Sequence, residues 1–382
     1  MKLRNIFTLI VVTLVASFMS GCSYKAYQSS NSGIEYYNNG QYEEAQKKFL
    51  EAVNEGADSA NDYVNLGMTS IALNDNEKAL EYFNKAVAAD KKSSTAHKGL
   101  AIAYLNTGNY DKVVEEIALV LEYADGKVTD LEKDALNYRA KAECMLGKYD
   151  DAIKTYGILI EVGYKQKNEY FERGKTYLAK GDITKAMEDF KSVIDLDKND
   201  YDTYYGIYCA LKDAGYEDES IQMIKGTLSI NADDAKGYYN KGKTYYILND
   251  MDKCVTELTQ AREAGSIEAS YLLGVVYMQK AEYQKAEPAL LEVIASENGK
   301  SAEAYNALGQ CYFRQANYDK AISCFEQGLT DYEDDETLLI NMAVAYEYKQ
   351  DFSMAAIKFS DVLNKYPDNE VAKHELEFLS GK

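Results

Sequence analysis

The chain has 382 residues, with 42 Lys and Arg against 62 Asp and Glu, so its formal net charge is −20. A surface this acidic repels phosphate backbones, and we therefore expect no nucleic-acid partner. Only two prolines occur, Pro288 and Pro367, and since proline costs about 3 kcal/mol inside a helix, this composition favours a helical protein.

The first residues are typical of a bacterial export signal. A positively charged start precedes the apolar run 6–19, which is shorter than the about 20 residues that a membrane span needs. Small residues at 20–21 then precede Cys22. This pattern resembles the lipobox of bacterial lipoproteins, although Met19 stands where that family usually has Leu. The resemblance implies a lipoprotein signal peptide over residues 1–21, and the alternative is a plain secretory signal with an incidental cysteine.

If the lipobox is used, Cys22 becomes the first residue of the mature chain and is the lipidation site. More than one acyl chain gives stable anchoring, because each buried methylene contributes about 0.8 kcal/mol. We then expect residues 22–29 to form a short tether. The expected location is the extracytoplasmic side of a bacterial cell membrane, with the chain anchored by lipid.

From residue 30 onward, a pattern of about 34 residues recurs roughly ten times. Each unit has a small residue, often a Tyr three later, an aromatic six after that, a small residue three on, and a bulky apolar residue four on. The pattern is plain in Gly309, Tyr312, Tyr318, Ala321 and Phe325. A period of this length predicts a stacked solenoid, which is a surface for partners.

Each unit is typical of two amphipathic helices joined by a tight turn. In most units a Gly or Asn stands between the two helices and ends the first one. These are the residues that most readily adopt the left-handed conformation that ends a helix. In the last three units Ala or Gln stands there, so we expect those turns to close differently or to carry strain. The ten positions are Gly40, Asn74, Gly108, Gly147, Gly181, Gly215, Asn249, Ala281, Ala316 and Gln350.

The second helix of most units carries an alanine in its first turns and a Phe or Tyr four residues later. We expect the alanine to face the small residue of the first helix, and the aromatic to fill the gap between one unit and the next. The alanines are Ala45, Ala79, Ala152, Ala186, Ala286, Ala321 and Ala355, and the aromatics are Phe49, Phe83, Tyr156, Phe190, Phe325 and Phe359.

This spacing resembles the tetratricopeptide repeat. The resemblance implies an all-α fold, a right-handed α-solenoid of about ten helix-turn-helix repeats with a C-terminal capping helix. Repeats 1–3 are expected in residues 30–125, repeats 4–10 in 126–367 and the capping helix in 368–382. The small residue of the first helix gives the phase: Gly33, Gly67, Ala101, Ala140, Gly174, Tyr208, Gly242, Gly274, Gly309 and Ala343.

Three irregularities interrupt the repeat. The step from Ala101 to Ala140 is 39 residues, which predicts a longer loop near residues 124–134, with Gly126 and Asp130 as breaker and cap. The unit around Tyr208 is degenerate, since Tyr replaces the small residue and Ser220 replaces Ala. Pro288 lies inside a second helix, where we expect it to kink the chain.

The sequence contains few residues in patterns typical of catalytic or metal sites. Only two histidines occur; His97 stands at a repeat aromatic and should be buried, and His374 should be solvated. No catalytic constellation, phosphate loop or zinc pattern is present, so we expect no enzyme, no metal and no cofactor. A calcium site at the acidic run 331–336 is a weak alternative. Cys311 and Cys324 fall on the two helices of one repeat, and their spacing leaves pairing open.

The inner curve is the expected binding surface, because the first helices line it in tetratricopeptide arrays. The usual inward positions of the family give a concave band: Lys141, Phe171, Lys175, Tyr205, Lys212, Tyr239, Lys243, Tyr246 and Tyr271. Lysine beside aromatics suits an extended peptide with acidic groups, or a sugar polymer that stacks on rings. The alternative is that these are ordinary solvated side chains. The lysine–asparagine pairing of carboxylate clamps does not match at Lys98 or Asn137.

The expected lipid anchor and the expected repeat array together favour a scaffold function. We expect a lipid-anchored scaffold that binds envelope proteins or peptides through its concave face. The alternative is a binding module for cell-wall glycan or secreted polysaccharide.

Overall fold

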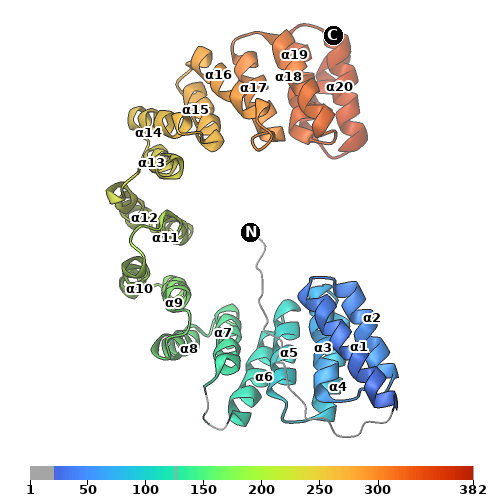
Figure 1. The fold of residues 1–382 in the computed structure, drawn as a ribbon. Coiled ribbons are helices and arrows are strands. Elements are labelled where there is room, and N and C mark those ends of the chain that lie inside the picture. The colour runs from blue at the N-terminus through green and yellow to red at the C-terminus, as the bar shows by residue number, and fades with distance from the viewer. Residues whose placement is uncertain (1–20, 125, 127, 382) are drawn as a thin grey trace. The chain divides into compact units, whose positions relative to one another are not determined.

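The computed structural model describes residues 21–124, 126 and 128–381. Within these residues every regular element is helical and none is a strand, which confirms the all-α prediction. The chain divides into two compact units, one ending at Asp197 and the other beginning at Lys198. Figure 1 shows each unit as a succession of helical hairpins.

The first unit holds five hairpins. Its helices are α1 (Gly21–Asn38), α2 (Tyr42–Asn54), α3 (Ala60–Ala72), α4 (Asn76–Ala89), α5 (Ser94–Asn106), α6 (Tyr110–Tyr123), α7 (Asp130–Met145), α8 (Tyr149–Glu161), α9 (Gln166–Lys180) and α10 (Ile183–Leu196).

The second unit holds five more hairpins and one final helix. Its elements are α11 (Tyr201–Asp213), α12 (Glu217–Lys225), the 3₁₀ helix η1 (Gly226–Ser229), α13 (Ala235–Ile247), α14 (Met251–Glu263), α15 (Ile267–Gln279), α16 (Tyr283–Ala295), α17 (Ala302–Arg314), α18 (Tyr318–Asp331), α19 (Glu336–Tyr348), α20 (Phe352–Lys365) and α21 (Glu370–Ser380).

Consecutive helices pack against each other within each unit, so the repeats stack in chain order. First helices of neighbouring repeats also touch, as α3 touches α5 and α15 touches α17. The last helix, α21, packs against α20 and buries Ala372 and Leu379. Ten hairpins and a capping helix in the described part of the chain match the predicted count.

All ten hairpin turns close in the left-handed conformation. The φ angle is +61° at Asn74 and +86° at Gly181, as the sequence predicted. Ala281 and Ala316 at +57° and Gln350 at +70° adopt the same geometry. The last three turns therefore close like the others, and they carry the strain of a Cβ in the left-handed region.

Hydrogen-bonding side chains begin most of the helices. Ser59 accepts a hydrogen bond from the Asp62 amide in a capping box, and Asp250 accepts one from the Lys253 amide. Such caps stabilise a helix by about 1 kcal/mol each. They fix where each hairpin starts and so keep the repeats in phase.

The predicted core positions are buried. Every alanine of the second-helix set is fully buried, as are Phe83, Phe190, Phe325 and Phe359. The partner of the small first-helix residue is this aromatic: a Cβ added at Gly174 would lie 2.6 Å from the Phe190 ring, and one at Gly67 would lie 2.6 Å from Phe83. Glycine is needed there because the ring occupies the space of the side chain.

The 39-residue step is accommodated partly as predicted: the connection 124–129 between α6 and α7 is longer than the connection 90–93 between α4 and α5. Gly126 has φ +76° and breaks the chain as expected. The cap is Thr129, whose hydroxyl accepts from the Leu131 amide, while Asp130 is the first residue of α7. Helix α7 has 16 residues against 13 in α5, so part of the insertion lengthens the helix instead of the loop.

Pro288 lies inside α16, which continues through it to Ala295. In the degenerate unit, α12 has nine residues against 14 in α10, and η1 replaces its last turn.

The N-terminal predictions fall mostly outside the described residues. Residues 1–20 of the expected signal peptide are not described, and neither is the side chain of Cys22. Residues 22–29, expected as a tether, belong to the first part of α1, and Ala26 is buried there. Among the described helices, none has the length and apolar character to cross a bilayer.

Candidate functional site

The nine predicted binding residues all lie on first helices. In the first unit, Lys141 is on α7, and Phe171 and Lys175 are on α9. In the second unit, Tyr205 and Lys212 are on α11 and Tyr271 is on α15. The three on α13 are Tyr239, Lys243 and Tyr246. They form two groups, one in each unit.

A hollow of about 470 Å³ opens between helices of the first unit. Lys141 and Lys175 line it together with Glu172, and most other lining atoms are apolar. We call it the α7–α9 hollow. The remaining lining residues are Leu105, Tyr110, Cys144, Met145, Tyr149, Tyr156, Thr176 and Ala179.

The two lysines of this hollow differ in their surroundings. Lys175 Nζ lies 3.1 Å from a carboxylate oxygen of Glu172 and 5.6 Å from the centre of the Phe171 ring. Lys141 is exposed and forms no ion pair within the described part of the chain. Lys141 is therefore the charge that is available to a ligand.

The Cys144 thiol in the wall of the hollow is a poor nucleophile. The Cys144 thiol lies 3.2 Å from the Thr176 hydroxyl, and burial raises the pKa of this thiol. A thiol with a raised pKa is a weak nucleophile at neutral pH. Met145, by contrast, is 62% exposed and presents an apolar, adaptable side chain at the surface.

Phe171 is a packing residue. Its ring lies 5.8 Å from the ring of Phe190, and it does not line the hollow. Lys141 and Lys175 therefore line one hollow, whereas the half-buried Phe171 lies beside the core aromatic Phe190.

A buried carboxyl that the sequence did not single out lies between α7 and α9. Glu169 is 1% exposed, and its Oε1 accepts a hydrogen bond of 2.9 Å from Asn137 Nδ2, while its Oε2 has no partner. Burial raises the pKa of Glu169 to about 7. The sequence shows only a Glu in the first turn of a helix, where an acidic residue is ordinary.

In the second unit, lysine and tyrosine side chains contact each other. Lys243 Nζ lies 4.4 Å from the centre of the Tyr205 ring and 5.7 Å from that of Tyr239. Tyr205 also stacks on Tyr208 at 5.9 Å, and Lys212 Nζ donates to the Tyr208 hydroxyl at 3.3 Å. We call these residues the Tyr205–Lys243 cluster. Each cation–π contact contributes about 0.5–1 kcal/mol at an exposed site.

The two remaining predicted residues stand apart from this cluster. The Tyr246 hydroxyl accepts a hydrogen bond of 2.8 Å from Gln279 Nε2. Tyr271 is half-buried and packs against the core of the last repeats. Both belong to the contacts between repeats.

The other sequence-based candidates have structural roles. His97 is 4% exposed and pairs with Glu116 at 2.6 Å, whereas the side chain of His374 is 78% exposed, and both agree with the prediction. Cys311 and Cys324 are free thiols. In the acidic run 331–336, Asp334 pairs with Lys365 and Asp335 caps α19. No group of metal-ligating side chains forms among the described residues.

Comparison with known proteins agrees with this architecture. Family models described as the tetratricopeptide repeat match residues 31–94, 70–132, 170–200, 235–263 and 265–334. The chain is a tetratricopeptide repeat protein. The matched segments fall on the stacked hairpins, and the degenerate unit around Tyr208 lies between two of them.

Two curated relatives resemble this tetratricopeptide repeat protein over part of their length. A TPR repeat-containing protein of Methanocaldococcus jannaschii is 26% identical over 268 residues, which are 66% of this chain and 46% of the relative. Tetratricopeptide repeat protein 6 of Homo sapiens is 24% identical over 172 residues, 45% of this chain and 32% of the relative. The chain thus spans less than half of either protein.

Among solved structures, a tetratricopeptide repeat protein from Parabacteroides merdae resembles this one with a TM-score of 0.47 and 16% identity. The match covers 66% of this chain and 99% of that one.

Proposed function

We propose that this protein is a scaffold that binds a peptide segment of another protein in the α7–α9 hollow. Tetratricopeptide repeats form extended surfaces for protein partners, because each repeat adds a helix to a continuous face. The observation that carries the proposal is the exposed, unpaired Lys141 at the edge of a mostly apolar hollow.

The hollow indicates the chemistry of the peptide. An apolar side chain of the ligand enters beside Leu105 and Met145, and burial of such a side chain contributes about 1.5–3 kcal/mol. An acidic side chain one or two residues away pairs with Lys141. The partner segment is therefore acidic and apolar in alternation.

The cell envelope is the proposed location of this scaffold. The lipobox-like pattern that ends at Cys22 supports a lipid anchor on the extracytoplasmic side of a bacterial membrane. An anchored array meets proteins that lie near the same membrane, and these are the proposed partners.

The glycan alternative is less well supported. Sugars stack on free aromatic faces, and Tyr205, which is 40% exposed, is the best such ring of the predicted band. Lys243 lies over both Tyr205 and Tyr239, so a cation occupies the space that a sugar ring needs. A glycan would have to displace two cation–π contacts before it could stack.

Selection of peptides from a random displayed library on the purified chain tests the peptide proposal. We expect sequences that alternate acidic and apolar residues. For a selected peptide, Lys141→Ala should weaken binding about tenfold, because a charge-assisted hydrogen bond contributes about 1.5–3 kcal/mol. Lys191→Ala is the matched control, since Lys191 is an exposed lysine on α10. Equal affinities of both variants would contradict the proposed site.

A further inference from the structure

Helix α1 extends past the start of its own repeat. In the repeat phase Gly33 corresponds to Gly67, and α3 begins seven residues before Gly67, at Ala60. Helix α1 begins twelve residues before Gly33, at Gly21. It is therefore five residues longer at its start, which is about 7.5 Å at 1.5 Å per residue. The first turn of α1 thus projects beyond the regular array.

Four exposed side chains cover the start of α1. The tyrosines Tyr24 and Tyr27 are 58% and 51% exposed. Lys25 and Gln28 are exposed beside them, and Gln28 Nε2 donates to the Tyr24 hydroxyl at 3.2 Å. Ala26, in the same stretch, is buried, so the helix is packed on the array and is not a free tether. We call Tyr24, Lys25, Tyr27 and Gln28 the α1 tip.

The charge of the α1 tip differs from that of the whole chain. Lys25 is the sole charged residue from position 22 to 34, whereas the chain carries −20. It forms no ion pair within the described part of the chain. Glu55, after the end of α2, accepts from the Ser29 hydroxyl at 2.9 Å, and Ser29 lies five residues behind Tyr24. An anionic lipid surface repels the acidic array but attracts this tip.

The proposed lipid attachment lies at the same end of the helix. Cys22 belongs to α1, two residues before Tyr24 and five before Tyr27, which is a rise of about 3 and 7.5 Å. The polar interface of a bilayer is about 5–7.5 Å thick on each side, because a core of about 30 Å lies within a total of about 40–45 Å. With acyl chains of Cys22 in the core, both rings therefore reach the interface. Tyrosine is enriched at this depth, since its ring is apolar and its hydroxyl is polar.

We propose that the α1 tip contacts the surface of the bilayer that holds the lipid of Cys22. The inference rests on the proposed lipid anchor. The rings of Tyr24 and Tyr27 lie among the lipid headgroups, and the Lys25 ammonium pairs with a lipid phosphate. The acyl chains hold the protein, while the tip fixes its direction. Because α1 runs without a break from Cys22 into the first hairpin, the first unit leaves the membrane in one direction.

The size of the α1 tip favours a lipid surface over a protein partner. A stable protein interface takes about 20–30 residues from each side, and the tip has four. A bilayer contact can be this small, because the acyl chains of the anchor already supply the affinity. The tip then needs only to match the polarity of the interface.

Tryptophan substitution tests the contact, because the chain contains no Trp. Full-length Tyr24→Trp is produced in a bacterium, purified in detergent and reconstituted into vesicles of phosphatidylethanolamine and phosphatidylglycerol. We expect a several-fold loss of emission when the phospholipids are brominated near the carbonyl end of the acyl chain, and a smaller loss when they are brominated near the methyl end. Tyr24 is exposed, so the variant should keep its fold, which circular dichroism and the melting temperature check.

Tyr42→Trp is the matched control. Tyr42 begins α2 at the opposite end of the same hairpin, and the 18 residues of α1 separate the two ends by about 27 Å. Its emission should be the same in brominated and plain vesicles. Equal quenching of both variants would overturn the proposal, because the contact would then not be specific to the α1 tip.

A charge reversal tests the role of the lysine. In the Tyr24→Trp background, Lys25→Glu should reduce the quenching by brominated lipids, because a carboxylate is repelled by phosphatidylglycerol. Lys47→Glu, an exposed change within α2, should leave the quenching unchanged. Unchanged quenching in Lys25→Glu would overturn the assigned contact of the lysine with lipid phosphate.

The acyl mass of the N-terminal peptide, measured on the same samples, separates this inference from the anchor. If the mass is present and Tyr24→Trp emits equally in brominated and plain vesicles, the anchor stands and the contact is overturned. If the mass is absent, the anchor and the contact fail together, and peptide binding in the α7–α9 hollow is unaffected. Protection of the indole from iodide without quenching by brominated lipid would assign the tip to a second copy of the chain and overturn the lipid contact.

Discussion

The buried carboxyl of Glu169 destabilises the repeat that contains it. The carboxyl is buried between two helices, and only one of its oxygens has a hydrogen-bond partner. Burial raises its pKa from the ordinary 4.5 to about 7. Between these two pH values the folded chain binds more protons than the unfolded chain at this site. The free energy of unfolding therefore falls as the pH rises from about 4.5 to 7.

Substitution of Glu169 by Gln should remove this pH dependence. The amide oxygen still accepts from Asn137, and no charge has to be buried. We expect Glu169→Gln to be more stable than wild type at pH 8, by urea midpoint, and the difference to shrink at pH 5. Glu188→Gln, an exposed change on α10, is the control. An advantage of the same size at both pH values would contradict the role of ionisation.

At the scale of the hairpin, the turn between the two helices depends on the conformation of a single residue. Ala281, Ala316 and Gln350 adopt positive φ although they carry a Cβ, because the two helices that they join fix the direction of the chain. The left-handed region costs such residues about 1–2 kcal/mol. The stacking of neighbouring repeats offsets this strain.

Ala316→Gly should relieve the strain in one turn. Glycine makes the unfolded chain more flexible at a cost of about 0.4–1 kcal/mol, so the expected net gain is below about 1 kcal/mol. The melting temperature should rise by a few degrees or less. Ala118→Gly is the matched control, because Ala118 is exposed in the interior of α6 and should lose about 0.5–1 kcal/mol. A fall in melting temperature for both variants would show that the turn is unstrained.

Most of each hairpin could be predicted from sequence because its signals are local and repeated. The breaker positions, the buried alanines and the aromatics such as Phe190 follow from spacing alone. The cap at Thr129 was missed because Thr129 and Asp130 are both good capping residues, and only backbone geometry chooses between them.

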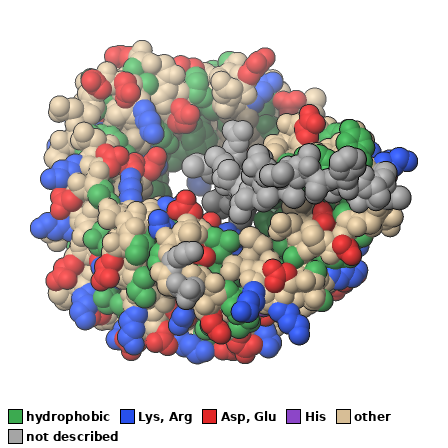
Figure 2. Space-filling view, turned by 60° about the horizontal axis from the view of Figure 1, so that its bottom comes forward, with side chains coloured by type: hydrophobic (Ala, Val, Ile, Leu, Met, Phe, Trp, Pro, Cys, Tyr) green, Lys and Arg blue, Asp and Glu red, His purple; other side chains and the backbone are tan. Residues whose placement is uncertain are grey.

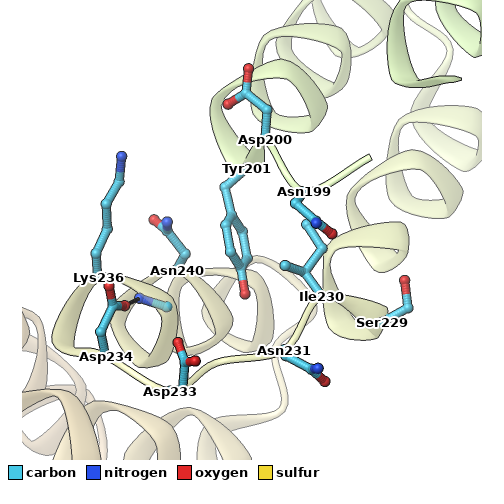
Figure 3. Close-up of a pocket in the computed structure, with 11 residues that line it drawn as sticks. Asn199, Asp200, Tyr201, Ser229, Ile230, Asn231, Asp233, Asp234, Lys236 and Asn240 are labelled. Atoms are coloured by element: carbon cyan, nitrogen blue, oxygen red, sulfur yellow. Dashed lines mark hydrogen bonds between the residues drawn. The ribbon is translucent and has the colours of Figure 1, made fainter. Parts of the chain in front are cut away.

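The surroundings of the candidate binding residues were harder to predict than the fold. Family phase placed Lys141 and Lys175 on first helices, but it could not show that Lys243 lies over Tyr205 or that Phe171 packs beside Phe190. The hollow beside η1, between the starts of α11 and α13 (Figure 3), depends on an irregular turn after α12, and the repeat pattern carries no information at a position where it fails.

At the scale of the whole molecule, 62 acidic residues outnumber 42 basic ones and give the charge of −20. Figure 2 shows acidic and basic side chains interspersed over the face that it presents. Many of them form short-range pairs, such as Lys85 with Glu81 and Lys253 with Asp250. Solvent screens exposed pairs of this kind, so they serve solubility more than stability. In the proposed function, the local surroundings of the α7–α9 hollow, and not the net charge, select the partner.

The proposed lipid anchor is the feature of the whole molecule that would most constrain the proposed partners. If Cys22 carries acyl chains, wild type should fractionate with membranes, and its N-terminal peptide should show the added acyl mass by mass spectrometry. Cys22→Ala should lose that mass and move to the soluble fraction once the signal is removed, because no acyl chain then buries methylenes at about 0.8 kcal/mol each. Cys209→Ala, the same change within α11, should behave as wild type. A Cys22→Ala protein that stays with membranes after removal of its signal would show that contacts of the array, and not a lipid, hold it there.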